Sequence, residues 1–139
     1  MGTFTEIEHT ADYALRVWGI NLSDVIQTAG QGLISMLLGG ETAPPVEELA
    51  YEVEAPDTAA LLLRALREVL YQVEEGRVPV AFEVLEAQED PPRATCRIGL
   101  AAEGTGRELL HRAIKAVTYH DLVLRPEAGG LTVTLTFDT

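Results

Sequence analysis

The chain has 139 residues, with 10 Lys and Arg against 22 Asp and Glu, a formal net charge of −12 and 47% hydrophobic residues. This length and apolar content predict a single folded domain over residues 1–139 and exclude a disordered chain. The acidic balance argues against direct nucleic-acid binding, which needs a dense Lys and Arg face. We therefore look for a protein partner, a cation or a small ligand.

The cellular compartment is indicated by what the sequence lacks. Cys96 is the single cysteine, so no disulfide can form within the chain, and it is expected to be a small core residue in a reducing cytoplasm. No apolar run approaches the roughly 20 residues of a membrane helix. The first residues lack the basic start and apolar stretch of a signal peptide. We expect a cytoplasmic protein without membrane contact.

The first forty residues read as two strands and a helix. Alternating apolar residues predict a strand over 13–18, with residues 4–8 as its partner and 9–12 as the connection between them. Apolar residues at helical spacing predict a helix over 22–37, capped by Asn21 or Ser23 and closed by Gly39-Gly40. Gly30 and Gly32 weaken this helix by up to about 1 kcal/mol each relative to alanine. They suggest that another backbone passes close by.

The middle of the chain continues with a linker over 41–48 and a half-buried strand over 49–55. A second helix follows, with Asp57 as its cap, an apolar stripe that includes Leu66, and Gly76 as its end. Residues 78–86 and 94–100 then read as a hairpin that turns through Asp90-Pro91-Pro92.

The last third is predicted to hold a short helix over 108–115, a strand over 117–124, a turn over 126–130 and a strand over 131–137. The alternation of the last strand places Asp138 off the core face, on the polar side or at the strand end. Strands and helices are interleaved without the strict alternation of a doubly wound sheet. The predicted class is therefore α+β.

Familiar catalytic motifs are missing from the sequence: it has no glycine-rich phosphate loop, no paired cysteines for zinc and no nucleophile elbow. The three histidines, His9, His111 and His120, lack the close spacing of a zinc pair, and structural roles fit them better. Lys115 is the single lysine beside nine arginines. It is either a chance occurrence or a compact ammonium needed where a planar guanidinium would not fit.

Two carboxylates stand apart from the many expected on the surface. Asp12 lies in the connection 9–12, and Asp138 precedes Thr139, the last residue. If the last strand ends beside that connection, both carboxylates and the terminal carboxylate converge. They would then either take up protons or bind a hard cation such as Ca²⁺ or Mg²⁺ through oxygen ligands. The alternative is a frayed terminus and an ordinary turn aspartate, and the spacing leaves both readings open.

Four segments together resemble the archease family, in order from near residue 6 to the end of the chain. They are His9-Thr10-Ala11-Asp12, Ala55-Pro56-Asp57 before a Leu-rich helix, Lys115-Ala116-Val117-Thr118-Tyr119-His120, and Asp138. The six-residue block is long enough to be specific, whereas the first segment alone would be weak. Gly106 and Ala113 depart from the family pattern, which often has Asp and Glu there.

The resemblance implies a non-catalytic accessory protein. Archeases assist the GTP-dependent RNA ligase that joins 3′-phosphate or 2′,3′-cyclic phosphate ends to 5′-hydroxyl ends in tRNA splicing and RNA repair. They promote guanylylation of that ligase and so restore it after each turnover. The family fold is α+β, built from strand-helix-strand-strand modules with helices packed on mostly antiparallel sheets.

The resemblance also implies a divalent cation, calcium in the first place, with Mg²⁺ and Mn²⁺ as alternatives. Its ligands here would be Asp12, Asp138 and Thr139. His9 is a further candidate, and Lys115 and His120 would either contact phosphate or only brace the carboxylates by hydrogen bonds. Two alternatives remain: a chaperone or modulator of proteins that process DNA or RNA, and a metal-dependent phosphohydrolase, which lacks an obvious nucleophile.

Overall fold

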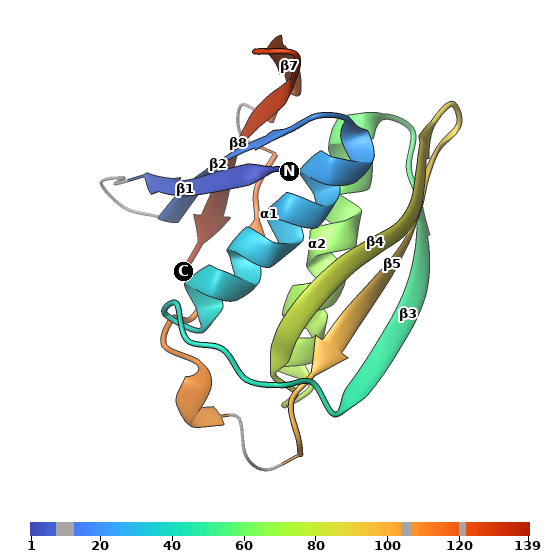
Figure 1. Cartoon of the computed structure of the whole chain (residues 1–139). Coiled ribbons are helices and arrows are strands. Elements are labelled where there is room, and N and C mark those ends of the chain that lie inside the picture. Colours follow the sequence, from blue (N-terminus) through green and yellow to red (C-terminus); the bar gives the residue numbers. More distant parts are fainter. Residues whose placement is uncertain (8–12, 104–106, 120–121) are drawn as a thin grey trace.

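The computed structural model describes residues 1–7, 13–103, 107–119 and 122–139. Two long helices, α1 (Leu22–Leu37) and α2 (Thr58–Glu74), lie between two antiparallel sheets (Figure 1). The predicted α+β class is confirmed. In the described part of the chain, no helix is long and apolar enough to cross a membrane.

The larger sheet joins the beginning of the sequence to its end. Its order is β1 (Thr3–Ile7), β2 (Tyr13–Gly19), β8 (Gly130–Asp138) and β6 (Ala116–Val117), and β7 (Arg125–Glu127) also pairs with β8. The antiparallel pairing predicted for the first two strands is present, in the register Phe4 to Val17. Strand β8 therefore lies in the middle of this sheet, with β2 along one edge and β6 and β7 along the other.

The smaller sheet has the order β3 (Glu47–Glu54), β5 (Pro92–Leu100) and β4 (Pro79–Glu89). Strands β4 and β5 form the predicted hairpin through Asp90 and Pro91, whose peptide bond is cis. Cys96 is fully buried on β5, which confirms its predicted position in the core.

Both helices begin at the predicted caps. The Asn21 side chain accepts a hydrogen bond from the backbone N–H of Asp24 at 2.9 Å, and the Asp57 side chain accepts one from Ala60 at 2.8 Å. The predicted stops are also in place, because Gly39 and Gly76 have φ angles of +61° and +84°, which favour glycine.

Helix α1 is buried around most of its circumference because it packs against strands of both sheets. The prediction that a backbone passes close to its glycines was wrong, since side chains fill that space. A Cβ on Gly30 would lie 2.2 Å from Cδ1 of Phe82, and one on Gly32 would lie 2.6 Å from a methyl group of Leu15. Glycine is required here by the packing of β4 and β2 on the helix.

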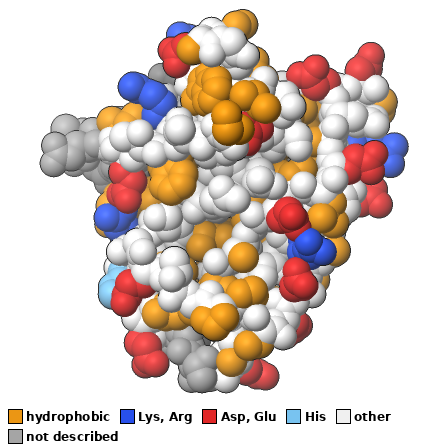
Figure 2. Space-filling view, in the orientation of Figure 1, with side chains coloured by type: hydrophobic (Ala, Val, Ile, Leu, Met, Phe, Trp, Pro, Cys, Tyr) orange, Lys and Arg blue, Asp and Glu red, His pale blue; other side chains and the backbone are white. Residues whose placement is uncertain are grey.

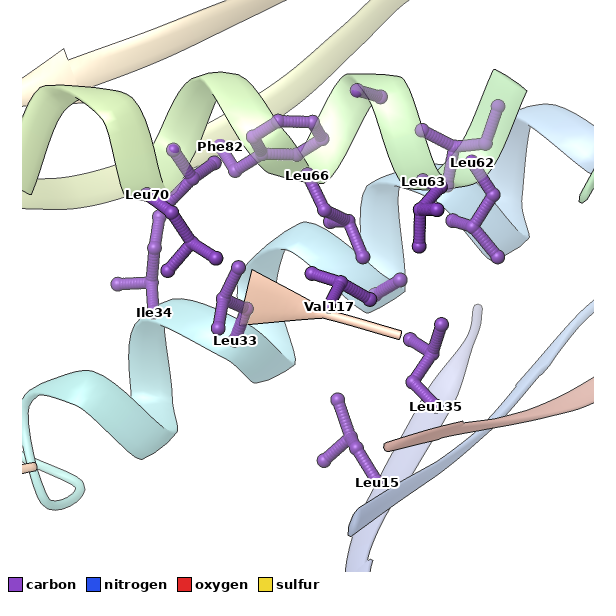
Figure 3. Close-up of a cluster of buried hydrophobic side chains, with 14 of the residues drawn as sticks. Leu15, Leu33, Ile34, Leu62, Leu63, Leu66, Leu70, Phe82, Val117 and Leu135 are labelled. Atoms are coloured by element: carbon purple, nitrogen blue, oxygen red, sulfur yellow. The ribbon is translucent and has the colours of Figure 1, made fainter. Parts of the chain in front are cut away.

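The core lies where the two helices meet the inner faces of both sheets (Figure 3). Leu33 of α1 and Leu66 of α2 are fully buried, and so are Leu15 and Leu135 of the larger sheet. Phe82 of β4 closes the other side with 4% of its surface exposed. Burial of this apolar surface is the main favourable term that holds both helices between the sheets.

Two predictions for the last third were wrong. Residues 108–115 form no α-helix: a 3₁₀ turn, η1 (Arg107–Leu109), is followed by irregular chain. Backbone N–H groups there make long-range bonds instead, from His111 to the carbonyl of Leu37 and from Lys115 to the carbonyl of Asp138, both at 2.8 Å. Of the predicted strand over 117–124, only Val117 is in a strand, as the end of β6, and the described residues 118, 119 and 122–124 are in none. Strand β7 occupies the start of the predicted turn over 126–130 instead.

Candidate functional site

The end of strand β8 is held in place by the segment that contains Lys115. Ala116 pairs with Asp138 and Val117 with Phe137 in the antiparallel ladder of β6 and β8. The backbone N–H of Lys115 donates to the carbonyl of Asp138 at 2.8 Å, and that of Thr118 donates to the carbonyl of Thr136 at 2.9 Å. Two of the segments that resemble the archease family, the one from Lys115 to His120 and the one at Asp138, therefore meet at the end of β8.

The alternation of β8 separates its buried side chains from its polar ones. Phe137 is fully buried, whereas Asp138 and Thr139 are exposed. Asp138 shares its face of the strand with Thr136 and Thr134, the face that points away from the helices. The predicted position of Asp138 off the core face is thus confirmed.

On its other edge, the end of β8 lies against the beginning of β2, where Tyr13 pairs with Phe137. The Tyr13 ring lies under the guanidinium of Arg112, 4.7 Å from ring centroid to Cζ. Arg112 also forms an ion pair with Glu6 of β1. These contacts fix the first described residue of β2 beside the strand end that carries Asp138.

Three of the predicted site residues, His9, Asp12 and His120, lie outside the described residues. Among the others, Asp138, Thr139 and Lys115 come together at the end of β8. The side chain of Lys115 is exposed and forms no ion pair with any residue that the structure describes. His111, for which a structural role is predicted, pairs with Glu41, and its backbone N–H donates to the carbonyl of Leu37 at the end of α1.

Tyr119 lies two residues after the end of β6, and 54% of its surface is exposed. The guanidinium of Arg67 on α2 lies over this ring, 5.7 Å from the centroid. The sequence gives no signal for the contacts of Arg67 and Arg112, because each arginine meets a tyrosine remote from it in the chain. Ala113, one of the two departures from the family pattern, is exposed, and the other, Gly106, lies outside the described residues.

The exposed side chain of Asp138 at this end of β8 has carboxylate oxygens, which are the type of ligand that a hard cation prefers. Within residues 1–7, 13–103, 107–119 and 122–139, no three His, Cys, Asp or Glu side chains come together in a group that could hold a metal ion. Among the described residues, this end of β8 therefore offers the single carboxylate side chain of Asp138 and no complete ligand set.

The shifted ionisable groups lie elsewhere, around the packing of α2 on the smaller sheet. Burial raises the pKa of the Tyr51 hydroxyl far above its usual value, and that hydroxyl donates to the carbonyl of Ala65 at 2.6 Å. Burial also raises the pKa of the Cys96 thiol to about 11 and that of the Glu68 carboxyl above its usual value. These groups belong to the core and its border, and none of them lies at the end of β8.

Comparisons with known proteins agree with this arrangement. The family model for the Archease protein family matches residues 4–139. The protein archease of Methanopyrus kandleri is 33% identical over 129 residues, which cover 89% of this chain and 90% of that protein. The protein archease of Thermococcus kodakarensis is 31% identical over 135 residues, covering 94% and 93%.

Two solved structures share the fold. The solution structure of Methanobacterium thermoautotrophicum protein 1598 has a TM-score of 0.77 at 20% identity, with 98% of each chain covered. The crystal structure of an archease from Thermotoga maritima, described as a possible chaperone, has a TM-score of 0.64 at 19% identity and covers 96% of this chain and 94% of that one. With the family model matching nearly the whole sequence, this chain belongs to the archease family.

Proposed function

We propose that this protein is a non-catalytic activator of a GTP-dependent RNA ligase that works in tRNA splicing and RNA repair in the cytoplasm. It promotes guanylylation of the ligase and thereby allows multiple turnovers. The observation that carries the proposal is the meeting of Lys115 with the end of β8 at Asp138, in a chain of the archease family. Both residues belong to the segments in which the sequence resembles that family.

The proposed site is a divalent-cation site, calcium in the first place, made by Asp138, Asp12 and Thr139. Asp138 is exposed on β8, where its backbone pairs with Ala116 of β6 and the preceding residue, Phe137, pairs with Tyr13 of β2. A cation bound there would supply positive charge that offsets the charge of a phosphate group. The role of Asp138 is to offer its carboxylate oxygens from a rigid strand, so that little ordering is needed on binding.

Lys115 is proposed as the cationic neighbour of this site. Its ammonium is exposed and forms no ion pair within the described residues, so it is available to an incoming phosphate or to the carboxylates themselves. His9 and His120 remain candidates for the same supporting role. Substitution of Lys115 distinguishes the two roles. If Lys115 contacts phosphate, its loss lowers guanylylation even when the cation is bound. If Lys115 only braces the carboxylates, its loss lowers the affinity for the cation.

The partner is proposed to be the ligase itself rather than RNA. The net charge of −12 disfavours a long phosphate backbone, and Figure 2 shows acidic side chains spread over the visible face rather than gathered at one place. A protein partner with a basic surface around its active-site mouth fits this charge.

The experiment compares Asp138→Asn with the unmodified protein in guanylylation of a cognate ligase at fixed divalent metal. Glu86→Gln on β4 is the matched control, because Glu86 is an exposed carboxylate in the other sheet. Asp12→Ala is tested beside it. We expect both aspartate variants to abolish stimulation while keeping the unfolding midpoint. Full stimulation by both would contradict the cation site.

A chaperone role is the second candidate, and the description of the Thermotoga maritima archease as a possible chaperone favours it. It predicts that this protein suppresses aggregation of several unrelated proteins that process DNA or RNA. The activator role predicts an effect on one ligase. Light scattering of heated client proteins, with and without this protein, distinguishes the two.

A further inference from the structure

The outer face of the larger sheet carries a groove of about 880 Å³ that the cation site does not use. Its lining residues come mainly from β2, β8 and β7, and Arg16 and Thr134 are exposed on the face of the sheet opposite its buried side chains. Figure 1 shows that both helices lie on one side of this sheet. Its lining includes the side chains of Arg16 and Arg125 and three threonines of β8, Thr132, Thr134 and Thr136.

The strand register places the two arginines on either side of β8. Arg16 of β2 pairs with Thr134, and Arg125 of β7 pairs with Thr132, so all four side chains share one face. Neighbouring strands are about 4.8 Å apart, and the two threonines are two residues apart on β8. Two guanidinium groups with long, flexible stems therefore flank a row of hydroxyl groups and can reach a common ligand.

These arginines differ from those on the outer face of the smaller sheet, which carboxylates neutralise. Arg97 is paired with Glu48 at 3.0 Å and with Glu83, and Arg93 lies 3.8 Å from Glu52. Arg16, in contrast, makes no ion pair in the part of the chain that the structure describes, and the same holds for Arg125. In a protein with twelve excess negative charges, two arginines that face one groove and have no carboxylate partner among the described residues can attract an anion to it.

The other residues that line the groove determine which kind of anion it can bind. Glu127, on β7 beside Arg125, is the one carboxylate among the described lining residues, so the lining keeps a net charge of +1. The hydroxyl of Thr132 donates to the carbonyl of Val17 at 3.0 Å, whereas Thr134 and Thr136 have no such bond among the described residues. Ile7, Val123 and Pro126 add an apolar wall.

We propose that this groove binds a small organic phosphate monoester. Guanidinium groups match the oxygens of a phosphate in geometry as well as in charge, and the hydroxyls of Thr134 and Thr136 can donate to the same group. The apolar wall receives the organic part of the ligand. A polyanion is disfavoured because phosphates outside the groove meet the acidic surface, and a metal cation is disfavoured by the two guanidiniums.

The test is calorimetric titration of the full chain with AMP, adenosine and inorganic phosphate at low ionic strength. We expect AMP to bind, inorganic phosphate to bind more weakly because it lacks contact with the apolar wall, and adenosine not to bind. Failure of AMP to bind at millimolar concentration overturns the proposal. Equal affinity for AMP and inorganic phosphate overturns the assignment to an organic ligand.

The variants Arg16→Gln and Arg125→Gln locate the binding. Each is expected to weaken AMP binding by about tenfold or more, because a hydrogen bond to a charged group contributes at least that factor. Arg93→Gln on the smaller sheet is the matched control and should leave the affinity unchanged. Equal losses in all three variants would point to net charge alone and overturn the proposed groove.

Single-stranded RNA of twelve nucleotides is the competing ligand. If it binds more tightly than AMP, with a steep dependence on salt, the groove is part of a nucleic-acid surface and the proposal is overturned. None of these titrations contains the ligase. Their outcome is therefore independent of the proposed activation of that enzyme.

Discussion

Cys96 gives the clearest pH dependence at the scale of single residues. Burial raises the pKa of its thiol from 9.0 to about 11, and the residue is fully buried. The folded protein therefore keeps a proton that the unfolded chain releases above pH 9. The stability linked to this thiol is present below pH 9 and is lost as the pH rises from 9 towards 11.

The prediction concerns thiol reactivity at pH 8. Alkylation of Cys96 by iodoacetamide should be much slower in the native protein than in urea, and its rate should follow the unfolded population. Mass spectrometry of the modified chain measures both rates. Equal rates in the native and unfolded protein would contradict the burial of the thiol.

Gly30 tests the packing of α1 on β4. Alanine favours helices by about 1 kcal/mol over glycine, but a Cβ at this position would lie 2.2 Å from Cδ1 of the buried Phe82 ring. We expect Gly30→Ala to lower the free energy of unfolding by about 1–3 kcal/mol, measured by urea denaturation. The double variant with Phe82→Leu should recover part of this loss, and additive losses would show that the two sites are not in contact.

Residue-scale features were predictable where they depend on near neighbours. The caps Asn21 and Asp57 and the polar face of Asp138 follow from spacings of two to four residues. The pairing of Arg112 with Tyr13 depends on the folded chain and has no local pattern. The arginines of the outer groove were missed for the same reason.

At the scale of elements, the apolar stripe of α2 is the most sensitive feature. Leu66 is fully buried among α1, α2 and the larger sheet (Figure 3). Leu66→Asp places a charge in this core, and we expect the chain to lose its cooperative unfolding transition. Tyr71→Asp on the same helix is the control, because Tyr71 is 50% exposed and the change should stay within about 0.5 kcal/mol. A folded Leu66→Asp protein, seen by circular dichroism, would refute this account of the core.

The elements that sequence patterns missed lie between residues 107 and 127. Leu110, Ala113 and Ile114 have helical spacing, yet Ala113 is exposed and the backbone of this segment bonds to α1 and β8 instead. Tertiary hydrogen bonds outweighed a weak local preference. The regular elements before residue 100 were predictable because their apolar stripes are long and their caps are explicit.

At the scale of the whole molecule, the pairing of β2 with β8 brings the start and end of the sequence together. Sequence alone allowed this convergence but could not establish it, because strand order depends on contacts more than a hundred residues apart. The structure places Asp138, Thr139 and Lys115 at one point, whereas the ligand roles of Asp12 and Asp138 stay predictions. The positions of the two aspartates in the predicted elements made them candidates, and the family resemblance implied their role as ligands.

The most direct test of the proposed activation is guanylylation and multiple-turnover ligation by a cognate ligase, measured with and without this protein at fixed divalent metal. The account predicts that substoichiometric amounts raise both the guanylylated fraction and the number of turnovers. It also predicts that Asp138→Asn removes the effect and that Glu86→Gln does not. A ligase that turns over equally well with and without the protein would contradict the activator role.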